Sequence, residues 1–245
     1  MGFMLVLAHR GYSSRAPENT MAAFRLALEA GADGLELDVQ LTRDGEAVVI
    51  HDFTLDRTTD GSGFVAQYTL AELRQFDAGG WFAPEFAGES IPTLAEVCEL
   101  VKEWKVLLNV ELKAGLGFET LNERLIDILI QYGIEEHTIV SSFNHYALAH
   151  LKQLRPEIRT GILYNAALVN PWVYAQSIGA SALHPYYLGV IPEIVQGAQR
   201  NGMMVNTWTV NEPADIQRTI AAQVDSIITD KPGLVLEILK QTNTD

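Results

Sequence analysis

Cysteine is almost absent from this chain, with Cys98 the only one among 245 residues. A single thiol cannot form a disulfide within the chain, so the sequence carries no mark of an oxidising compartment. Cys98 lies in an apolar helical pattern, and we interpret it as a small buried hydrophobic side chain. Long hydrophobic runs are also missing, and no window approaches the roughly 20 apolar residues of a membrane span.

Basic residues are scarce as well: 17 Lys and Arg stand against 31 Asp and Glu, which gives a formal net charge of −14. A strongly acidic protein is a poor partner for nucleic acid or for an anionic membrane surface. An anionic substrate must therefore be met by local positive charge or by a metal ion. The N-terminal apolar run stops at His9, too early for a signal peptide, so we expect a cytoplasmic protein.

What the chain does contain is a regular alternation of short apolar runs and amphipathic stretches, with 48% hydrophobic residues overall. Eight such strand–helix units can be counted from residue 4 onward, and repeated units with short links predict parallel strands. Eight units in this length predict a closed TIM (β/α)8 barrel. An open doubly wound sheet is the alternative, but no GxGxxG turn follows the first strand. Residues 53–91 break the rhythm, and we interpret them as a small insertion after the second-strand region of one domain spanning residues 1–245.

Acidic side chains gather at the carboxyl ends of two predicted strands, where the chemistry of such barrels lies. Side chains alternate between the faces of a strand, so Glu36 and Asp38 of GLELDVQL share the inward face. Glu111 and Lys113 of LLNVELK lie on the inward face in the same way. Three carboxylates without thiolates or a histidine cluster favour a hard-oxygen site for one Mg²⁺ or Ca²⁺.

Two histidines fit the same mouth: His9 ends the first strand, and His51 ends the strand in EAVVIHD. An imidazole pair beside a metal ion is suited to general acid–base catalysis near neutral pH. Arg10 offers a guanidinium fork that matches phosphate oxygens. Each group alone could be structural, and Lys113 could simply neutralise Glu111. Five ionisable residues on the inward phase of neighbouring strands are hard to explain by packing.

Aromatic residues end two later strands of the predicted barrel. Trp208 in VNTWTVN and Phe143 in TIVSSF could wall a pocket for an apolar or glycerol-like group. The alternative is that both are core residues. His184, at another strand end, is a weaker candidate for the site.

Several motifs together carry a resemblance to a known family. The runs HRGYSSRAPENTMAAF, LELDVQLTRDGEAVVIHD, LDRTTDGSG, IPTLAEV, VELK and NTWTVN resemble the glycerophosphodiester phosphodiesterase family, in its short cytoplasmic bacterial form. The resemblance extends from about residue 5 to 235, with the motifs in the expected order. It implies a TIM barrel with a small insertion, and hydrolysis of small-molecule glycerophosphodiesters to glycerol 3-phosphate and an alcohol.

The resemblance also implies roles for individual residues, each by a match of motifs. The acid–base pair would be His9 and His51. The ligands of one Mg²⁺ or Ca²⁺ would be Glu36, Asp38 and Glu111. The phosphate-binding cations would be Arg10 and Lys113. Glu18 and Asn19 of the PENT motif are expected to order the site. No departure from these motifs argues for an inactive member.

Other functions remain open at this point. A phospholipase D-like relative acting on lysolipids would share the barrel and the metal site, although such enzymes tend to be secreted and disulfide-bonded. A non-catalytic phosphodiester-binding barrel, or a metal-dependent aldolase using Lys113, are further alternatives. The sequence leaves undecided the head group, the native metal, which histidine is the acid, whether water or the glycerol 2-hydroxyl attacks, and whether the chain forms a homo-oligomer.

Overall fold

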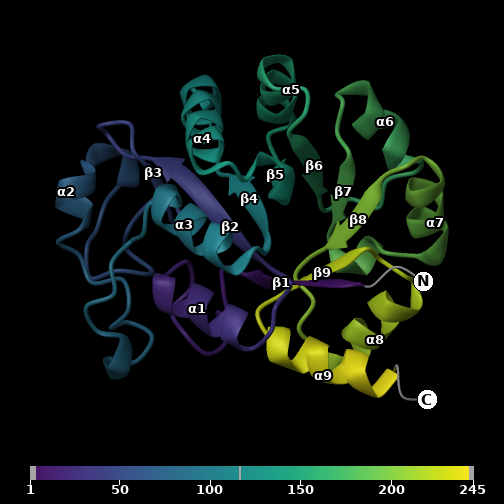
Figure 1. The fold of residues 1–245 in the computed structure, drawn as a ribbon, viewed down its shortest axis with the longest axis horizontal. Coiled ribbons are helices and arrows are strands. Elements are labelled where there is room, and N and C mark those ends of the chain that lie inside the picture. Colours follow the sequence, from purple (N-terminus) through teal and green to yellow (C-terminus); the bar gives the residue numbers. More distant parts are fainter. Residues whose placement is uncertain (1–3, 116, 243–245) are drawn as a thin grey trace.

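A closed barrel of parallel strands forms the centre of the molecule in the computed structural model, which describes residues 4–115 and 117–242. Within these residues β1 pairs with both β9 and β2, which closes the ring in the order β1-β9-β8-β7-β6-β5-β4-β2 (Figure 1). The predicted TIM barrel is therefore confirmed. Its strands are β1 (Leu5–His9), β2 (Gly34–Leu41), β4 (Leu107–Leu112), β5 (Thr138–Ser142), β6 (Arg159–Tyr164), β7 (Ala182–Pro185), β8 (Met204–Thr207) and β9 (Ser226–Thr229).

Helices follow the strands in turn and surround the barrel (Figure 1). Local signals in the sequence explain their ends: Thr20 caps α1, Thr93 and Glu96 form a capping box at α3, and Gly133 ends α4 in the left-handed conformation. The helices of this shell are α1 (Met21–Glu29), α3 (Leu94–Trp104), α4 (Phe118–Tyr132), α5 (His145–Leu154), α6 (Pro171–Ser177), α7 (Pro192–Arg200), α8 (Pro213–Ala221) and α9 (Pro232–Thr242). No helix in the described part of the chain is long and apolar enough to cross a membrane.

The two faces of β2 show how the alternation of side chains builds both the core and the mouth. Leu35, Leu37 and Val39 are fully buried in the main hydrophobic core between strands and helices. Glu36 and Asp38 occupy the opposite phase, which in a barrel is the interior. The core therefore holds the carboxyl-bearing face of β2 in a fixed orientation.

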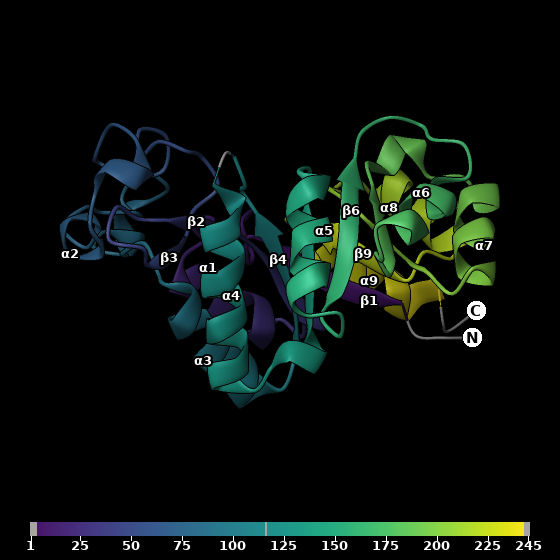
Figure 2. The same ribbon diagram turned by 90° about the horizontal axis from the view of Figure 1, so that it is seen from above.

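The predicted insertion lies beside the barrel, between β2 and α3, as Figure 2 shows. β3 (Ala47–Val49) precedes the predicted residues 53–91 and pairs antiparallel with β2 outside the ring, so the excursion from the barrel begins earlier than predicted. Residues 53–91 contain the short helix α2 (Leu70–Leu73) and 3-10 turns at Val65–Gln67 and Pro84–Phe86. A separate small hydrophobic cluster packs the insertion: Val48, Ile50, Leu55, Val65, Leu73, Ala78 and Ile91. The insertion thus has a core of its own, joined to the barrel through β3.

Candidate active site

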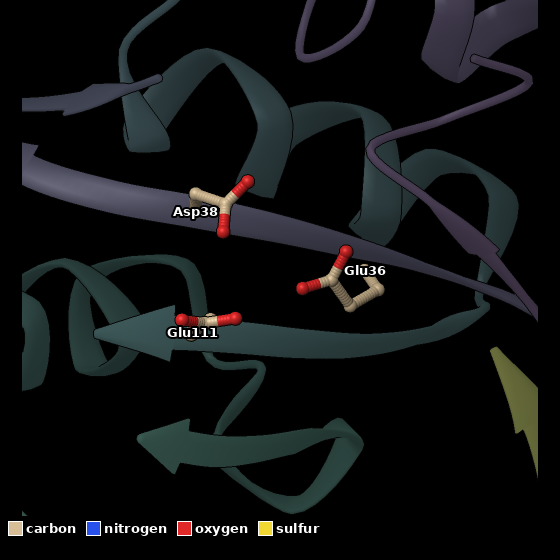
Figure 3. A group of neighbouring side chains, drawn as sticks. All are labelled: Glu36, Asp38 and Glu111. Atoms are coloured by element: carbon tan, nitrogen blue, oxygen red, sulfur yellow. The ribbon is translucent and has the colours of Figure 1, made fainter. Parts of the chain in front are cut away.

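Three buried carboxylates meet at the mouth of the barrel, where β2 and β4 lie side by side (Figure 3). The register pairs Asp38 with Glu111, and Glu36 lies one inward position before Asp38. Each side chain offers an oxygen, and these three oxygens all lie within 4.8 Å of one another. Glu36 is 3% exposed, Asp38 0% and Glu111 8%. Three negative charges that lie this close together and are shielded from water require a counter-charge.

Two cations from the protein supply part of that counter-charge. Lys113 hydrogen-bonds Glu111 and places Nζ 3.1 Å from Asp38 Oδ1, while Arg10 Nε lies 3.2 Å from Asp38 Oδ2. Burial opposes ionisation of Asp38, but Lys113 and Arg10 outweigh it and hold the pKa of this carboxyl below its usual range. Burial, with repulsion from Asp38 and Glu111, raises the pKa of Glu36.

The acidic cluster fits a divalent cation. Three carboxylates and two cationic side chains leave the cluster with one net negative charge when all are ionised. Asp38 Oδ1 and Arg10 Nε are buried without a hydrogen-bond partner among the described residues, although each lies near an opposite charge. All-oxygen donors suit Mg²⁺ or Ca²⁺ better than zinc. The donor chemistry, the remaining charge and the spacing therefore agree with one such ion.

His9 faces this cluster from the end of β1. Its Nδ1 lies 2.6 Å from Asp230 Oδ1, and its Nε2 lies 4.0 Å from Glu36 Oε2. Asp230 is held in turn by Ser13 Oγ at 2.9 Å and Asn211 Nδ2 at 2.5 Å. Burial alone would lower the pKa of His9, but the Glu36 charge and the Asp230 hydrogen bond raise it above its ordinary value. The carboxylate behind the ring fixes Nδ1 and directs Nε2 into the mouth.

His51, on the side of the site next to the insertion, is also backed by a carboxylate. Its Nδ1 lies 2.6 Å from Asp52 Oδ1. Gln40 on β2 holds the turn by donating its amide hydrogens to the carbonyls of Ile50, His51 and Asp52 at 2.7–3.1 Å. Burial, together with the charges of nearby cations, lowers the pKa of His51. The mouth therefore holds two imidazoles, each backed by a carboxylate.

The loop after β1 shapes the Arg10 side of the site. Arg10 has a left-handed φ of 55°, and its backbone N–H donates to Glu36 Oε2 at 3.1 Å. Gly11 follows at φ 83°, where an added Cβ would lie 2.6 Å from the Ala23 backbone, so glycine is required there. Arg10 Nη1 donates to Glu18 Oε1 at 2.8 Å.

The PENT segment also reaches the acidic cluster, since Asn19 Nδ2 donates to Asp38 Oδ2 at 2.8 Å. The structure thus places Glu18 and Asn19 against Arg10 and Asp38, respectively. This is the position in which they could order the site.

Aromatic rings line the opposite part of the mouth. Phe143 follows β5 and Trp208 follows β8, and their ring centroids lie 5.4 Å apart, edge to face. Because β6 and β7 lie between β5 and β8 in the barrel, this contact spans the ends of two intervening strands. Tyr186, after β7, packs on Trp208 at 5.5 Å. Phe143 is 47% exposed, so this part of the predicted wall is open to solvent.

His184 differs from the other two histidines because it is fully buried inside the barrel. Its Nε2 lies 3.0 Å from Asn206 Nδ2, and the ring occupies space that a Cβ on Gly161 would fill. Burial lowers the pKa of His184 to about 3, so the ring is neutral. His184 is therefore packed inside the barrel and is not grouped with His9 and His51 at the site.

Three functional candidates were not predicted from the sequence: Asp230, Asp52 and Arg57. Asp230 directly follows β9, and β9 pairs with β1, so an acidic residue at that strand end could have been matched to His9. Asp52 belongs to the HD motif, but the sequence pattern assigned no role to it. Arg57 binds Asp52 and Glu18, and no periodic signal marks it because it lies in an irregular loop of the insertion.

Comparison with known proteins agrees with this geometry. The family described as "Glycerophosphoryl diester phosphodiesterase family" matches residues 9–234. A glycerophosphodiester phosphodiesterase of Caldanaerobacter subterraneus is 49% identical over 97% of this chain and 98% of its own length. A second, from Bacillus altitudinis, is 38% identical over 96% of this chain and 98% of its own length.

A solved structure extends the comparison to three dimensions. An Oleispira antarctica phosphodiesterase, solved in complex with the product sn-glycerol-3-phosphate, matches with a TM-score of 0.92 and 34% identity, covering 96% of each chain. The family match, the relatives and the shared fold therefore all support the resemblance seen in the motifs. The chain belongs to the glycerophosphoryl diester phosphodiesterase family, and the prediction that it is an enzyme of this class is confirmed.

Proposed function

We propose that this protein hydrolyses glycerophosphodiesters to sn-glycerol 3-phosphate and an alcohol, with one divalent cation and two histidines. The observation that carries the proposal is the meeting of the acidic cluster with two carboxylate-backed imidazoles at one barrel mouth. The Oleispira structure with bound sn-glycerol-3-phosphate supports the choice of substrate class.

Glu36, Asp38 and Glu111 would hold the cation. When bound, a dication stabilises negative charge on a phosphoryl oxygen as a Lewis acid. Ordinary Mg²⁺ and Ca²⁺ sites are built from such oxygens, so both ions are candidates.

Arg10 and Lys113 would bind and orient the phosphodiester. A phosphodiester carries one negative charge, and displacement at phosphorus concentrates more charge on the oxygens that stay. The guanidinium and the ammonium are already fixed at the mouth by Asp38, Glu18 and Glu111, so they need little reorganisation during the reaction. They give an anionic substrate a local site in a protein of net charge −14.

His9 and His51 would move the protons. In each ring Nδ1 is occupied by a carboxylate, which leaves Nε2 for the substrate. One Nε2 accepts a proton from the attacking hydroxyl, and the other donates a proton to the departing alcohol oxygen, so the alcohol leaves neutral. The attacking hydroxyl is either water, which gives glycerol 3-phosphate directly, or the glycerol 2-hydroxyl. The second route would give a cyclic phosphate that water then opens to glycerol 3-phosphate, and both routes use the same pair of rings.

The experiment is an assay of purified protein with glycerophosphocholine and glycerophosphoethanolamine, each with Mg²⁺ or Ca²⁺, by release of glycerol 3-phosphate. We expect release that EDTA stops and that the added cation restores. Glu36→Ala should weaken cation binding in calorimetry. Absence of release from every glycerophosphodiester with either cation, together with turnover of a lysolipid, would favour the phospholipase D-like function instead.

A further inference from the structure

The insertion contributes a guanidinium that bridges two parts of the site. Arg57 Nε and Nη2 donate to Asp52 at 2.6 and 3.2 Å, and Arg57 Nη1 and Nη2 donate to Glu18 at 2.7 and 2.8 Å. The planar fork of Arg57 thus engages both oxygens of both carboxylates. Lysine cannot reproduce such double bidentate geometry, because its ammonium is a single point charge.

Each carboxylate that Arg57 holds touches a different functional group. Asp52 holds Nδ1 of His51, and Glu18 holds Nη1 of Arg10. An unbroken series of contacts therefore runs from His51 through Asp52, Arg57 and Glu18 to Arg10. Its two ends are the proton-transfer ring and the phosphate-binding cation of the proposed reaction.

The backbone around Arg57 is rigid enough for this task. Leu55 is fully buried in the hydrophobic cluster of the insertion, and Thr58 and Thr59 are buried on the other side of Arg57. The Leu55 N–H donates to the Gly63 carbonyl at 3.0 Å, and the Thr59 N–H donates to the Leu55 carbonyl at 3.1 Å. The packing of the insertion therefore determines where the guanidinium lies.

We propose that Arg57 is a positioning residue, which aligns His51 and Arg10 with each other through Asp52 and Glu18. This inference rests on the proposed function, because it assumes that both ends act in phosphodiester hydrolysis. The Arg57 side chain is 45% exposed, and ion pairs at such exposure contribute only about 0–1 kcal/mol to stability. A purely structural role would therefore be weak, whereas a misalignment near 1 Å lowers turnover by about 10²-fold.

The test compares Arg57→Gln and Arg57→Lys with Arg74→Gln as a matched control. Arg74 is also in the insertion, and its side chain is 34% exposed and binds both oxygens of Glu96 at 2.8 and 2.9 Å, outside the site. We expect Arg57→Gln to lower kcat/KM for glycerophosphoethanolamine by about 10- to 100-fold. Arg57→Lys should recover only part of that loss, and Arg74→Gln should match the wild type. Both Gln variants should shift Tm by no more than about 4 °C.

A second readout separates positioning from mere loss of structure. The charges that act on His51 are Asp38, Asp52, Arg10 and Lys113, with Arg57 behind Asp52. Removing the Arg57 charge frees Asp52 to stabilise the protonated ring, so the limb of the pH–rate profile set by His51 should move to higher pH. The same upward shift should appear in the NMR titration of the His51 ring, assigned with His51→Gln.

The two readouts also distinguish failure of the inference from failure of the proposed function. An unchanged His51 titration in Arg57→Gln, or a kcat/KM equal to that of Arg74→Gln, would overturn the positioning role. A wild-type protein that releases no glycerol 3-phosphate would contradict the proposed function. In that case the ring titration, which needs no turnover, still decides whether Arg57 acts on His51.

Discussion

The two halves of the barrel mouth are built on different principles. Around β1, β2, β4 and β9, nearly every candidate site residue is held by an ionic or hydrogen-bonded partner, as His9 is by Asp230. Around β5, β7 and β8, the side chains that meet are aromatic rings, and Phe143 is half exposed. The charged half holds its side chains through directional ionic and hydrogen-bonded contacts, and proton and phosphoryl chemistry requires such fixed positions. The aromatic half offers apolar surface with fewer directional constraints, which suits binding of an organic group.

The largest expected effect lies in the charged half, at its imidazoles. In the proposed mechanism His9→Ala removes one of the two proton-transfer groups, so kcat should fall by about 10²- to 10⁴-fold. Steady-state kinetics of glycerol 3-phosphate release would measure it, with Asp230→Asn as a milder variant of the same ring's support. Near-normal kcat in His9→Ala would mean that the charged half does not perform the acid–base step.

A large effect on stability is expected at Lys113. Lys113→Met leaves Asp38 and Glu111 without their shared ammonium, and removal of one partner from a buried pair costs about 3–5 kcal/mol. Urea unfolding of the cation-free protein should show this loss. Added Mg²⁺ or Ca²⁺ should restore more stability to the variant than to the wild type. Equal stability of both proteins without cation would show that the acidic cluster does not need Lys113.

A smaller effect belongs to His184, which lies below both halves inside the barrel. Its folded pKa of about 3 lies under the unfolded value near 6.5, so only the unfolded state takes up a proton as the pH falls between them. Stability is therefore complete above pH 6.5 and declines on acidification, by about 2 kcal/mol at pH 5. His184→Gln should flatten the pH dependence of the free energy of unfolding in this window while leaving the aromatic and charged halves in place. An unchanged slope would contradict a neutral buried ring.

The smallest effect is expected in the aromatic half. Phe143→Ala removes one exposed face of the wall, and truncation of a partly exposed aromatic contact costs about 1 kcal/mol. We expect KM to rise by about fivefold while kcat stays within a factor of two, with Phe143→Leu nearer to the wild type. A loss confined to kcat would show that the two halves do not divide binding and chemistry in this way.

The sequence predicted the barrel and the acidic cluster because both follow from simple periodicity. Alternation of side chains placed Glu36 and Asp38 inward, and the parallel register then brought Glu111 opposite Asp38. The motifs likewise located the two histidines. What the pattern could not supply was the set of partners behind them, since Asp230 lies 221 positions from His9 along the chain.

The insertion shows the same limit more strongly. Residues 53–91 were recognised as an interruption, but their internal cluster and the reach of Arg57 depend on irregular turns, which have no periodic signature. The aromatic wall was predicted only as one of two alternatives, because a tryptophan at a strand end can serve either a core or a pocket. The assignment of residues 1–245 to one domain, the cytoplasmic location and the possibility of a homo-oligomer stay predictions.

The most direct measurement is an anomalous-scattering map from crystals soaked with Mn²⁺, an ion that accepts the same carboxylate oxygens as Mg²⁺. The account predicts one strong peak bonded at once to Glu36, Asp38 and Glu111, with Nε2 of His9 and of His51 facing a phosphate oxygen when sn-glycerol 3-phosphate is added. A map with no peak among these carboxylates, or with the ion held by other residues, would contradict it.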